Sequence, residues 1–581
     1  MTATAERLPA STGALAVPAA GGRHEHVPAA VVLLTFLVAA VVVVPVATPA
    51  LVSDEWLYAR SVDDLVTHGA LRVSDLSVAT LVFQILWGGL FTVVVGHSFL
   101  ALRLSTVTLF VLSGVAFYAL LLQLGVSPRR AALGLAAYLF NPLSFALALS
   151  FMSDAPFLAL LVIATACYVR GLAHDGSSRR WVLAGALACA CGALVRHHAL
   201  LVPAAVVAWL LLTRRVERSA KGAGLLAAVA ALPVAATVAY YTWLMVGDGI
   251  PYGQRLFIEE AGGTGLGGAL ELGSRLGFTE LMFIGFFALP VAVAAATSLP
   301  AVVGGLRRRH RLVAAAWLSA LGVGLVIFIG EGRPWPYVGQ FVRAAGLGPD
   351  DLLVGRRPLL GGAGLYVVTA VCALASAVVA LVLGRLGRAE ARHPSAISLV
   401  LVIAVTQAVA VVLPSFHTWA WDRAITFDRY LLPLLPFAIC LPLVALRGLR
   451  LRLLPAGVVV ALLAVVSTAG TRDALVFHRA VWDVGNEAHR AGVARDRIDA
   501  GAAWDGYHLS DGSFEHRAPT RTPNPPWWVD YFAPATDSSY VVAGGPVPGY
   551  DVVRRVQRRG WLARDEMSVF LLRRQSVAGP P

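Results

Sequence analysis

The stretch VPAAVVLLTFLVAAVVVVPVATPALVSDEWLY, residues 27–58, is the point from which the rest of the chain can be understood. Its apolar part, from about residue 29 to residue 51, is long enough to cross a membrane as one helix. Asp54 and Glu55 follow directly after it, and carboxylates at a membrane boundary are costly to place. They are either the solvated start of a loop or part of a site.

The composition is that of a membrane protein with many spans. Of the 581 residues, 57% are hydrophobic and 14% are charged, and the mean hydropathy is +0.71, whereas soluble domains carry about 25% charged residues. The formal net charge of +13 comes from arginines in short clusters between apolar runs. This is the pattern of cytoplasmic loops, so the charge indicates membrane orientation, and no nucleic-acid partner is expected.

The apolar runs predict an all-α polytopic fold with about thirteen transmembrane helices. The run from 181 to 213 is too long for one crossing at about 1.5 Å per residue, so we divide it at Arg196, His197 and His198. The run from 79 to 95 is expected to lie in the interface or to re-enter, because a crossing there would move the later arginine clusters outside. The predicted spans are residues 29–51, 98–124, 131–149, 155–172, 181–195, 198–213, 222–246, 279–303, 312–330, 361–384, 396–413, 430–446 and 453–469.

The arginine clusters orient this fold in the plasma membrane. With the spans above, the clusters at 129–130, 179–180, 214–215, 307–311, 385–388 and 447–450 all fall on one face, which the positive-inside rule makes cytoplasmic. Asp54, Asp154, Arg196 and the segment 414–429 then share the outer face, although the spans were not chosen to achieve this.

Three parts of the chain follow from this arrangement. Residues 1–28 are expected to form a disordered cytoplasmic tail, since they are rich in Ala, Pro, Thr and Gly without periodicity. Residues 29–469 form the transmembrane domain, and residues 470–581 a small soluble α/β domain outside the membrane. Within this last domain, we predict strands at 539–543 and 567–572 and a helix at 550–559.

Asp154 lies in the motif FMSDAP, residues 151–156. The simpler interpretation is a helix start, with Ser153 or Asp154 as the N-cap and Pro156 in the first turn. That interpretation is compatible with a functional one, because a helix N-terminus also orients a carboxylate or favours an anion. The five cysteines all fall inside apolar runs, so neither a disulfide framework nor a metal site is predicted from them.

Two cationic motifs complete the set of candidate site residues. Arg196 and His197 interrupt an apolar segment, and Arg429 begins the motif RYLLP, residues 429–433. The simpler interpretations are snorkelling to the interface and an aromatic belt with interfacial charges. The functional interpretation is a clamp on a lipid phosphate, which the forked guanidinium of arginine suits by its geometry.

Together these motifs resemble the GT-C glycosyltransferases. The resemblance consists of an acidic pair after the first span, Asp-x-Pro at a later helix start, a basic residue between two short spans, and Arg-Tyr-Leu-Leu-Pro late in the chain. It covers about residues 29–446 and is strongest to the branch of the protein O-mannosyltransferases and the lipid A aminoarabinose transferase. Relatives often have Lys-Gly between the two short spans, where this chain has Arg196 and His197.

The resemblance implies transfer of a hexosyl or pentosyl group from a polyprenyl-phosphate sugar to an acceptor hydroxyl of a glycan, lipid or protein at the cell envelope. Asp54 is then expected to be the general base, with Glu55 as the second candidate and Asp154 as an orienting carboxylate. No metal ligand is assigned, and a divalent cation stays open because some relatives bind one and others do not. The expected phosphate-binding residues are Arg196, His197 and Arg429, and the expected substrate-binding residues are Tyr58, His417, Trp421 and Tyr430.

Two other functional classes remain open at this point. A polytopic chain with charges near the membrane also fits a transporter or a flippase for lipid-linked sugars, which would show charges near mid-membrane and an inverted repeat. We find no repeat, and the acids lie at the ends of spans. The third class is a receptor that binds glycan through Trp527, Trp528 and Tyr531 without chemistry, which a transfer assay would distinguish from an enzyme.

Overall fold

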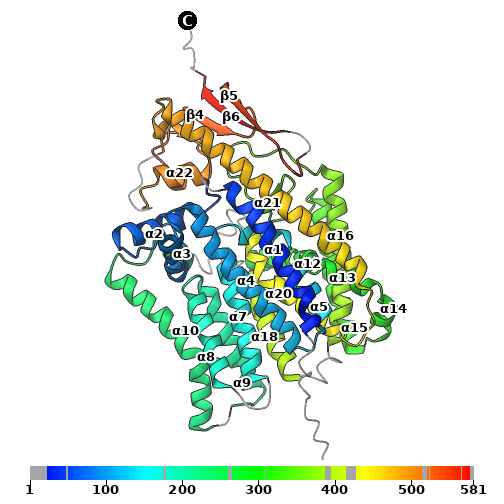
Figure 1. Cartoon of the computed structure of the whole chain (residues 1–581). Coiled ribbons are helices and arrows are strands. Elements are labelled where there is room, and N and C mark those ends of the chain that lie inside the picture. The colour runs from blue at the N-terminus through cyan, green and yellow to red at the C-terminus, as the bar shows by residue number, and fades with distance from the viewer. Residues whose placement is uncertain are drawn as a thin grey trace, which may run out of the picture.

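The computed structural model describes residues 23–47, 50–173, 178–216, 218–259, 265–306, 308–335, 337–386, 394–413, 427–512, 520–522, 524–563 and 566–575. It is a helical bundle with a small sheet at one end (Figure 1). The α-helices are α1 (Val27–Val43), α2 (Glu55–His68), α3 (Val82–Val95), α4 (Phe99–Gln123), α5 (Pro128–Leu139), α6 (Pro142–Ala148), α7 (Asp154–Leu172), α8 (Arg179–Ala193), α9 (Leu201–Leu212), α10 (Ala220–Val246), α11 (Tyr252–Glu259), α12 (Gly265–Phe287), α13 (Leu289–Ala296), α14 (Leu299–Gly304), α15 (Arg308–Gly330), α16 (Gly362–Leu383), α18 (Pro394–Val412), α20 (Leu435–Ala445), α21 (Leu453–Arg490), α22 (Ala502–Leu509) and α23 (Trp527–Phe532). The 3-10 helices are η1 (Arg23–His26), η2 (Val44–Ala47), η3 (His197–Leu200), η5 (Asp428–Leu434) and η6 (Arg495–Arg497), and the strands are β1 (Val342–Arg343), β2 (Gly346–Leu347), β3 (Ile498–Asp499), β4 (Tyr540–Ala543), β5 (Tyr550–Arg558) and β6 (Met567–Arg574).

In the described part of the chain, nine helices are long and apolar enough to cross a membrane, or up to eleven if each of two bent pairs forms one span. The remaining two predicted spans correspond to α8, with 15 residues, and to the apolar stretch His197–Leu212. The expected membrane fold, helical with a small C-terminal sheet region, is therefore confirmed, whereas the total of thirteen spans stays a prediction. The predicted break at Arg196 is present, since α8 ends at Ala193 and η3 begins at His197.

Two predicted spans are sharply bent. α5 and α6 meet at 65°, and α12 and α13 meet at 68°. At the first bend, the Asn141 side chain accepts a hydrogen bond from the backbone N–H of Leu143 (3.1 Å), and Pro142 occupies the first turn of α6. Pro290 lies in the first turn of α13. Proline is tolerated in the first turn of a helix, but it interrupts a helix that would continue through it. Both bends therefore have a local cause.

The two most buried candidate spans lie at the centre of the bundle. The spans Asp154–Leu172 and Asp428–Ala445 each have 89% of their apolar window buried, compared with 17% for α10 and 22% for the span His310–Gly330. The first begins at the site candidate Asp154, and the second begins at Asp428, directly before the site candidate Arg429. A charge at the start of a buried helix needs a partner, so these helix starts are natural places for ion pairs.

The sheet near the C-terminus has the strand order β3-β4-β6-β5, with β3 and β4 parallel and the other pairs antiparallel. The strands predicted at 539–543 and 567–572 are confirmed as β4 and β6. The helix predicted at 550–559 is wrong, because Tyr550–Arg558 forms the edge strand β5. Its three valines favour extended backbone, and its ladder with β6 supplies hydrogen bonds that local sequence cannot reveal.

The C-terminal segment packs directly over the start of the chain. The guanidinium of Arg60 on α2 donates to the carbonyl of Ser510 (2.6 Å), and Trp56 packs edge-on against Phe532 with 5.1 Å between the ring centroids. At the other side of the sheet, the Asp473 carboxylate on α21 accepts from the backbone N–H groups of Trp561, Leu562 and Ala563. Since α21 runs through residue 470 without a break, the expected domain boundary there stays a prediction.

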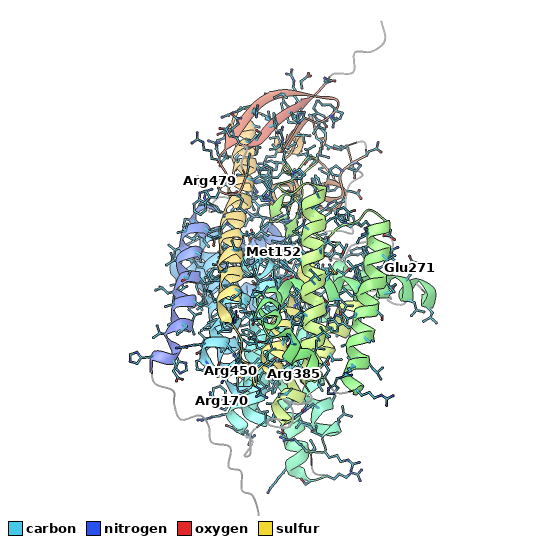
Figure 2. The ribbon with its side chains drawn as sticks, turned by 90° about the vertical axis from the view of Figure 1, so that its right-hand side faces the viewer. Met152, Arg170, Glu271, Arg385, Arg450 and Arg479 are labelled. Carbon is cyan, nitrogen blue, oxygen red and sulfur yellow. The ribbon has the colours of Figure 1, made fainter. Side chains whose placement is uncertain are left out.

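Arginines from the segments between predicted spans lie away from the C-terminal sheet. Arg170, Arg385 and Arg450 lie toward the end opposite the sheet, and Met152 lies between them and the sheet (Figure 2). Arg385 and Arg450 belong to the clusters from which the cytoplasmic face was predicted. The orientation proposed below uses this placement.

Candidate active site

Asp54 pairs with an arginine 375 residues further along the chain. After η2, the backbone turns at Ser53, whose φ of 49° is unusual for a residue other than glycine, and Asp54 becomes the N-cap of α2. Arg429 Nη2 donates to Asp54 Oδ2 over 2.9 Å. The Asp54 side chain is 26% exposed and that of Arg429 is 6% exposed, so the pair lies at the edge of the buried region.

A second ion pair joins Asp154 and Arg196. Arg196 Nη2 lies 2.9 Å from Asp154 Oδ1, and its Nε donates to Ser153 Oγ over 3.0 Å. Asp154 is in the first turn of α7, and Arg196 is the N-cap of η3. The break between the two short helices therefore places a cation at the start of the buried α7, as its carboxylate requires.

Tyr430 brings the two pairs together. Its ring centroid lies 5.7 Å from the guanidinium carbon of Arg196 and 5.4 Å from that of Arg429, both within cation–π distance. The group of Asp54, Asp154, Arg196 and Arg429 therefore forms one cluster with a net charge of zero, which we call the paired-charge cluster. Two of its buried atoms, Asp154 Oδ2 and Arg429 Nε, have no hydrogen-bond partner among the described residues, as is expected where a ligand supplies the partner.

Tyr58 lies beside the paired-charge cluster. Its ring is buried, and this burial, together with the Asp54 carboxylate, raises the pKa of the Tyr58 hydroxyl, while Arg429 and Arg196 oppose the shift. The hydroxyl is therefore neutral at physiological pH and can donate a hydrogen bond. Tyr58 and Tyr430 line the same cluster, as the sequence analysis expected for substrate-binding residues.

Glu55 is adjacent to Asp54 in sequence but belongs to a different environment. Its side chain is fully buried and forms an ion pair with Arg103 over 2.9 Å. Oε2 also accepts from the N–H of Val52 (2.8 Å), and Oε1 accepts from the N–H of Phe151 (2.5 Å). Both oxygens are occupied, and the carboxylate ties together the end of the first span, α4 and the loop before α7.

The remaining predicted site residues are placed as follows. His197 Nε2 lies 2.6 Å from the hydroxyl of Tyr241, and its ring stacks on that of Tyr241 with 5.7 Å between the centroids. Its polar contact is therefore with α10, whereas Arg196 beside it contacts the start of α7. His417 and Trp421 lie outside the described residues.

The structure adds Asp428 to the residues that build the site. The carboxylate of Asp428 is completely buried and accepts from the backbone N–H groups of Gln340, Phe341 and Val342, with a shortest distance of 2.6 Å. It thus anchors the loop 331–361 next to Arg429. Its position directly before Arg429 is a signal in the sequence, but the sequence analysis assigns it no role of its own.

Asp351 is a second residue that the sequence analysis missed. Burial and then the neighbouring Asp54 carboxylate raise its pKa to about 7, whereas Arg343 and Arg429 lower it. Asp351 belongs to the same loop as Arg343, and these neighbours place it close to the paired-charge cluster. Its only signal in the sequence was the pair of acids at 350 and 351, which has the same form as the pair at 54 and 55.

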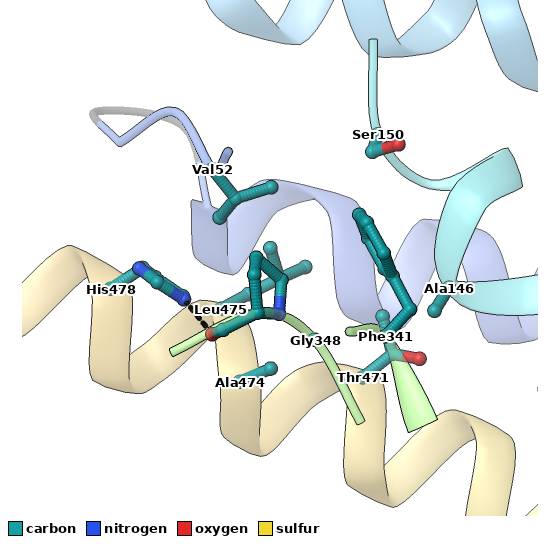
Figure 3. Close-up of a pocket in the computed structure, with 10 residues that line it drawn as sticks. Val52, Ala146, Ser150, Phe341, Gly348, Thr471, Ala474, Leu475 and His478 are labelled. Atoms are coloured by element: carbon teal, nitrogen blue, oxygen red, sulfur yellow. Dashed lines mark hydrogen bonds between the residues drawn. The ribbon is translucent and has the colours of Figure 1, made fainter. Parts of the chain in front are cut away.

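Helix α21 also holds the loop 331–361, through a hydrogen bond to Pro349. His478 Nε2 donates to the carbonyl of Pro349 over 2.8 Å (Figure 3). A small cavity of about 10 Å³ lies beside this bond, lined among others by Val52, Ser150 and Phe341 (Figure 3). This volume holds at most about one water molecule, so the cavity is a packing gap of the loop anchor.

The described ranges contain no group of three or more His, Cys, Asp and Glu side chains that could hold a metal ion. The carboxylates of the paired-charge cluster face arginines instead. The open question of a divalent cation therefore stays as the sequence left it.

Comparison with known proteins finds a family match for part of the chain. Residues 81–241 match the family model described as dolichyl-phosphate-mannose-protein mannosyltransferase. This segment includes Asp154, Arg196 and His197. No curated protein matches the sequence.

Among solved structures, ArnT from Cupriavidus metallidurans in the apo state is similar, with 15% identity over 96% of this chain and 98% of that chain, and a TM-score of 0.42. The same protein bound to undecaprenyl phosphate matches with 15% identity over 96% of this chain and 99% of that chain, and a TM-score of 0.40. The archaeal oligosaccharyltransferase AglB from Archaeoglobus fulgidus, in complex with an inhibitory peptide and a dolichol-phosphate, matches with 12% identity over 87% of this chain and 63% of that chain, and a TM-score of 0.39. The family match over residues 81–241 confirms the predicted resemblance of this chain to the GT-C membrane glycosyltransferases.

Proposed function

We propose that this protein is a membrane glycosyltransferase that moves a sugar from a polyprenyl-phosphate donor to a hydroxyl group of an extracytoplasmic acceptor. The observation that carries the proposal is the paired-charge cluster, in which two carboxylates and two guanidiniums from four separate segments meet around Tyr430. The family match supports it, because the family description names a polyprenyl-phosphate sugar, dolichyl-phosphate-mannose. The same chemistry requires a base for the acceptor and cations for the leaving phosphate.

In this proposal, Asp54 is the general base. The acceptor oxygen attacks the anomeric carbon of the donor sugar, and its proton passes to the Asp54 carboxylate. The bond from that carbon to the phosphate oxygen breaks, and the lipid phosphate leaves with the bonding electron pair. Because attack and departure occur on opposite sides of the carbon, the configuration inverts.

Arg196 and Arg429 would stabilise the charge that develops on the leaving phosphate. Without donor, each guanidinium is neutralised by a carboxylate. A donor phosphate at Arg429 would compete with Asp54 for its hydrogen bonds and leave Asp54 free to accept a proton. Glu55 takes no part, since its oxygens are already occupied by Arg103 and the backbone. We assign it a structural role.

The alternative classes are less well supported by the site. A transporter or flippase needs no base, yet Asp54 is solvent-accessible beside two phosphate-binding candidates. The receptor alternative relied on Trp527, Trp528 and Tyr531, and Trp528 is buried, with its Nε1 donating to Asp499 over 3.2 Å. A transfer assay distinguishes all three classes.

The test of the proposal is Asp54→Asn, measured with a radiolabelled undecaprenyl-phosphate sugar and cell-envelope membranes as acceptor. The substitution keeps the shape of the side chain but removes the proton acceptor, so transfer is expected to fall by at least about 100-fold. The matched control is Asp64→Asn on the same helix, at a carboxylate that is 44% exposed and pairs only distantly, over 3.7 Å, with His68. Full transfer by Asp54→Asn would end its assignment as the base.

We also propose that the paired-charge cluster and the C-terminal sheet lie on the extracytoplasmic face of the plasma membrane, opposite the end that carries Arg385 and Arg450. Thr67→Cys on α2 should then react with an impermeant maleimide in intact cells, and Ser127→Cys, in the short loop before Arg129, should not. Both positions are exposed, and four of the five native cysteines are buried. Reaction of Ser127→Cys alone would invert the orientation.

A further inference from the structure

A cavity of about 570 Å³ lies in the loop 331–361, outside the paired-charge cluster. Its walls include Trp335, Tyr337, Arg343, Asp350, Leu353 and Arg356. Pockets that bind small molecules have volumes of about 300–1,000 Å³ and carry a few convergent polar groups. This cavity has the size of such a pocket and is not explained by the chemistry assigned so far.

The charges in the wall leave one cation in excess. Arg356 is committed, since its Nε donates to Asp350 Oδ1 over 2.6 Å and its Nη2 donates to the carbonyl of Gly348 over 2.9 Å. Arg343 has only a distant ion pair within the described ranges, with 3.9 Å between its Nε and Asp350 Oδ2, and it is 38% exposed. The Asp350 carboxylate thus faces two guanidiniums. That of Arg343 makes fewer contacts among the described residues and is accessible to a ligand.

Two aromatic residues of the wall carry polar atoms that the protein leaves unused. Trp335 and Tyr337 are 4% and 8% exposed, and their Nε1 and hydroxyl groups have no hydrogen-bond partner in the described part of the chain. Buried polar groups are nearly always paired, so each such case needs an explanation. Aromatic rings with spare donors beside a cation favour a hydroxyl-rich ligand with a negative charge.

A backbone hydrogen bond connects the wall of this cavity to the paired-charge cluster. The N–H of Val342 donates to Asp428 Oδ2 over 2.6 Å. Arg343 directly follows Val342 in the chain, and Arg429, the partner of Asp54, directly follows Asp428. A ligand in contact with Arg343 is therefore close to the segment that carries the arginine partner of the proposed base.

From this geometry we infer that the cavity binds the acceptor, and that the acceptor is a sugar with an acidic substituent held by Arg343. The identification of this sugar as the acceptor rests on the proposed function. The binding of an acidic sugar in the cavity does not depend on it. Trp335 and Tyr337 supply hydrogen-bond donors, and the Asp350–Arg356 ion pair borders Arg343 in the same wall. The donor phosphate is held separately, by Arg196 and Arg429.

The experiment uses a cysteine placed in the cavity wall as a reporter. Leu353→Cys is labelled with a maleimide in the purified protein, in the presence of increasing concentrations of methyl β-glucuronide or of the neutral methyl β-glucoside. Leu353 lines the cavity and is 39% exposed, so the new thiol is accessible. Pro358→Cys, in the same wall and also exposed, is a second reporter in case the first variant is unstable.

Glucuronide is expected to slow labelling at lower concentrations than glucoside does. Adding Arg343→Gln should raise the apparent Kd for glucuronide about tenfold, as expected for the loss of one charged hydrogen bond. Arg357→Gln is the matched control, since Arg357 is an exposed arginine of the same loop that does not line the cavity. Equal protection by both sugars, no protection by either, or protection that is insensitive to Arg343→Gln would overturn the inference.

These outcomes are separate from the test of the proposed function. If the reporters are protected but Asp54→Asn transfers sugar normally, the sugar site stands and the proposed base fails. If Asp54→Asn is inactive but no sugar protects either reporter, the proposed base stands and the cavity inference alone is overturned.

Discussion

Asp54 and Glu55 are neighbours in the chain, yet they form two ion pairs of opposite character. The Glu55–Arg103 pair is 0% and 1% exposed, and its carboxylate also accepts two backbone N–H groups. The Asp54–Arg429 pair is 26% and 6% exposed, and Arg429 retains an unpaired Nε within the described residues. Consecutive residues at a helix start point in different directions, so one acid enters the core while the other faces the cluster.

The difference shows that the same residue types can form a closed pair and a pair that is open to exchange. A buried pair whose hydrogen bonds are all made cannot exchange partners without a large free-energy cost. The Asp54–Arg429 pair is accessible to solvent, and Arg429 keeps a donor that is unused among the described residues. A ligand phosphate can therefore replace the Asp54 carboxylate as the partner of Arg429. We therefore expect substitutions in the first pair to reduce stability and substitutions in the second to reduce activity or affinity.

The largest expected effect is on stability, in Glu55→Gln. This change leaves the Arg103 guanidinium buried without its counter-charge, which typically costs about 3–5 kcal/mol. The measurement is the thermal unfolding midpoint in detergent, together with the yield of monodisperse protein. Asp54→Asn is the matched control and should lose less stability, because its pair is partly solvated. A stable but inactive Glu55→Gln would break the comparison and move Glu55 into the chemistry.

A smaller effect is expected on donor binding, in Arg429→Lys. Lysine keeps the charge that balances Asp54 but loses the forked donors that suit a phosphate. Binding of undecaprenyl phosphate should weaken by about 1.5–3 kcal/mol, the contribution of one charged hydrogen bond, while the unfolding midpoint changes little. The control is Arg170→Lys, because Arg170 lies in the last turn of α7, at the end away from Asp154 (Figure 2). Unchanged affinity would remove Arg429 from the donor site.

The last expected effect concerns pH and Asp351. Burial raises its pKa from 3.8 to about 7, so between about pH 4 and pH 7 the folded protein holds a proton that the unfolded chain has released. Stability contributed by this group therefore falls as the pH rises through that window, by at most about 1.4 kcal/mol per pH unit. In Asp351→Asn, the difference between the unfolding midpoints at pH 5 and pH 8 should shrink. An unchanged difference would show that Asp351 is not buried beside Asp54.

Much of this architecture could be predicted from the sequence, because its signals are local. Runs of apolar residues determine where helices cross a membrane, and the break at Arg196 follows from the length of its run. Strands β4 and β6 were recognisable from their composition. The bends at Asn141 and Pro290 also had local signals, a cap residue and an early proline, which the hydropathy pattern alone conceals.

Other features depend on partners far away in the chain, and only the tertiary structure decided them. β5 is a strand because β6 pairs with it, and both oxygens of Glu55 are occupied because Arg103 and the backbone of Phe151 reach it from later elements. The sequence by itself determined the membrane-spanning helical fold and pointed to the candidate site residues Asp54, Asp154, Arg196 and Arg429. The tertiary structure decided which charges meet, because electrostatic pairing depends on distance in space and on burial, and neither is encoded in the spacing of residues along the chain.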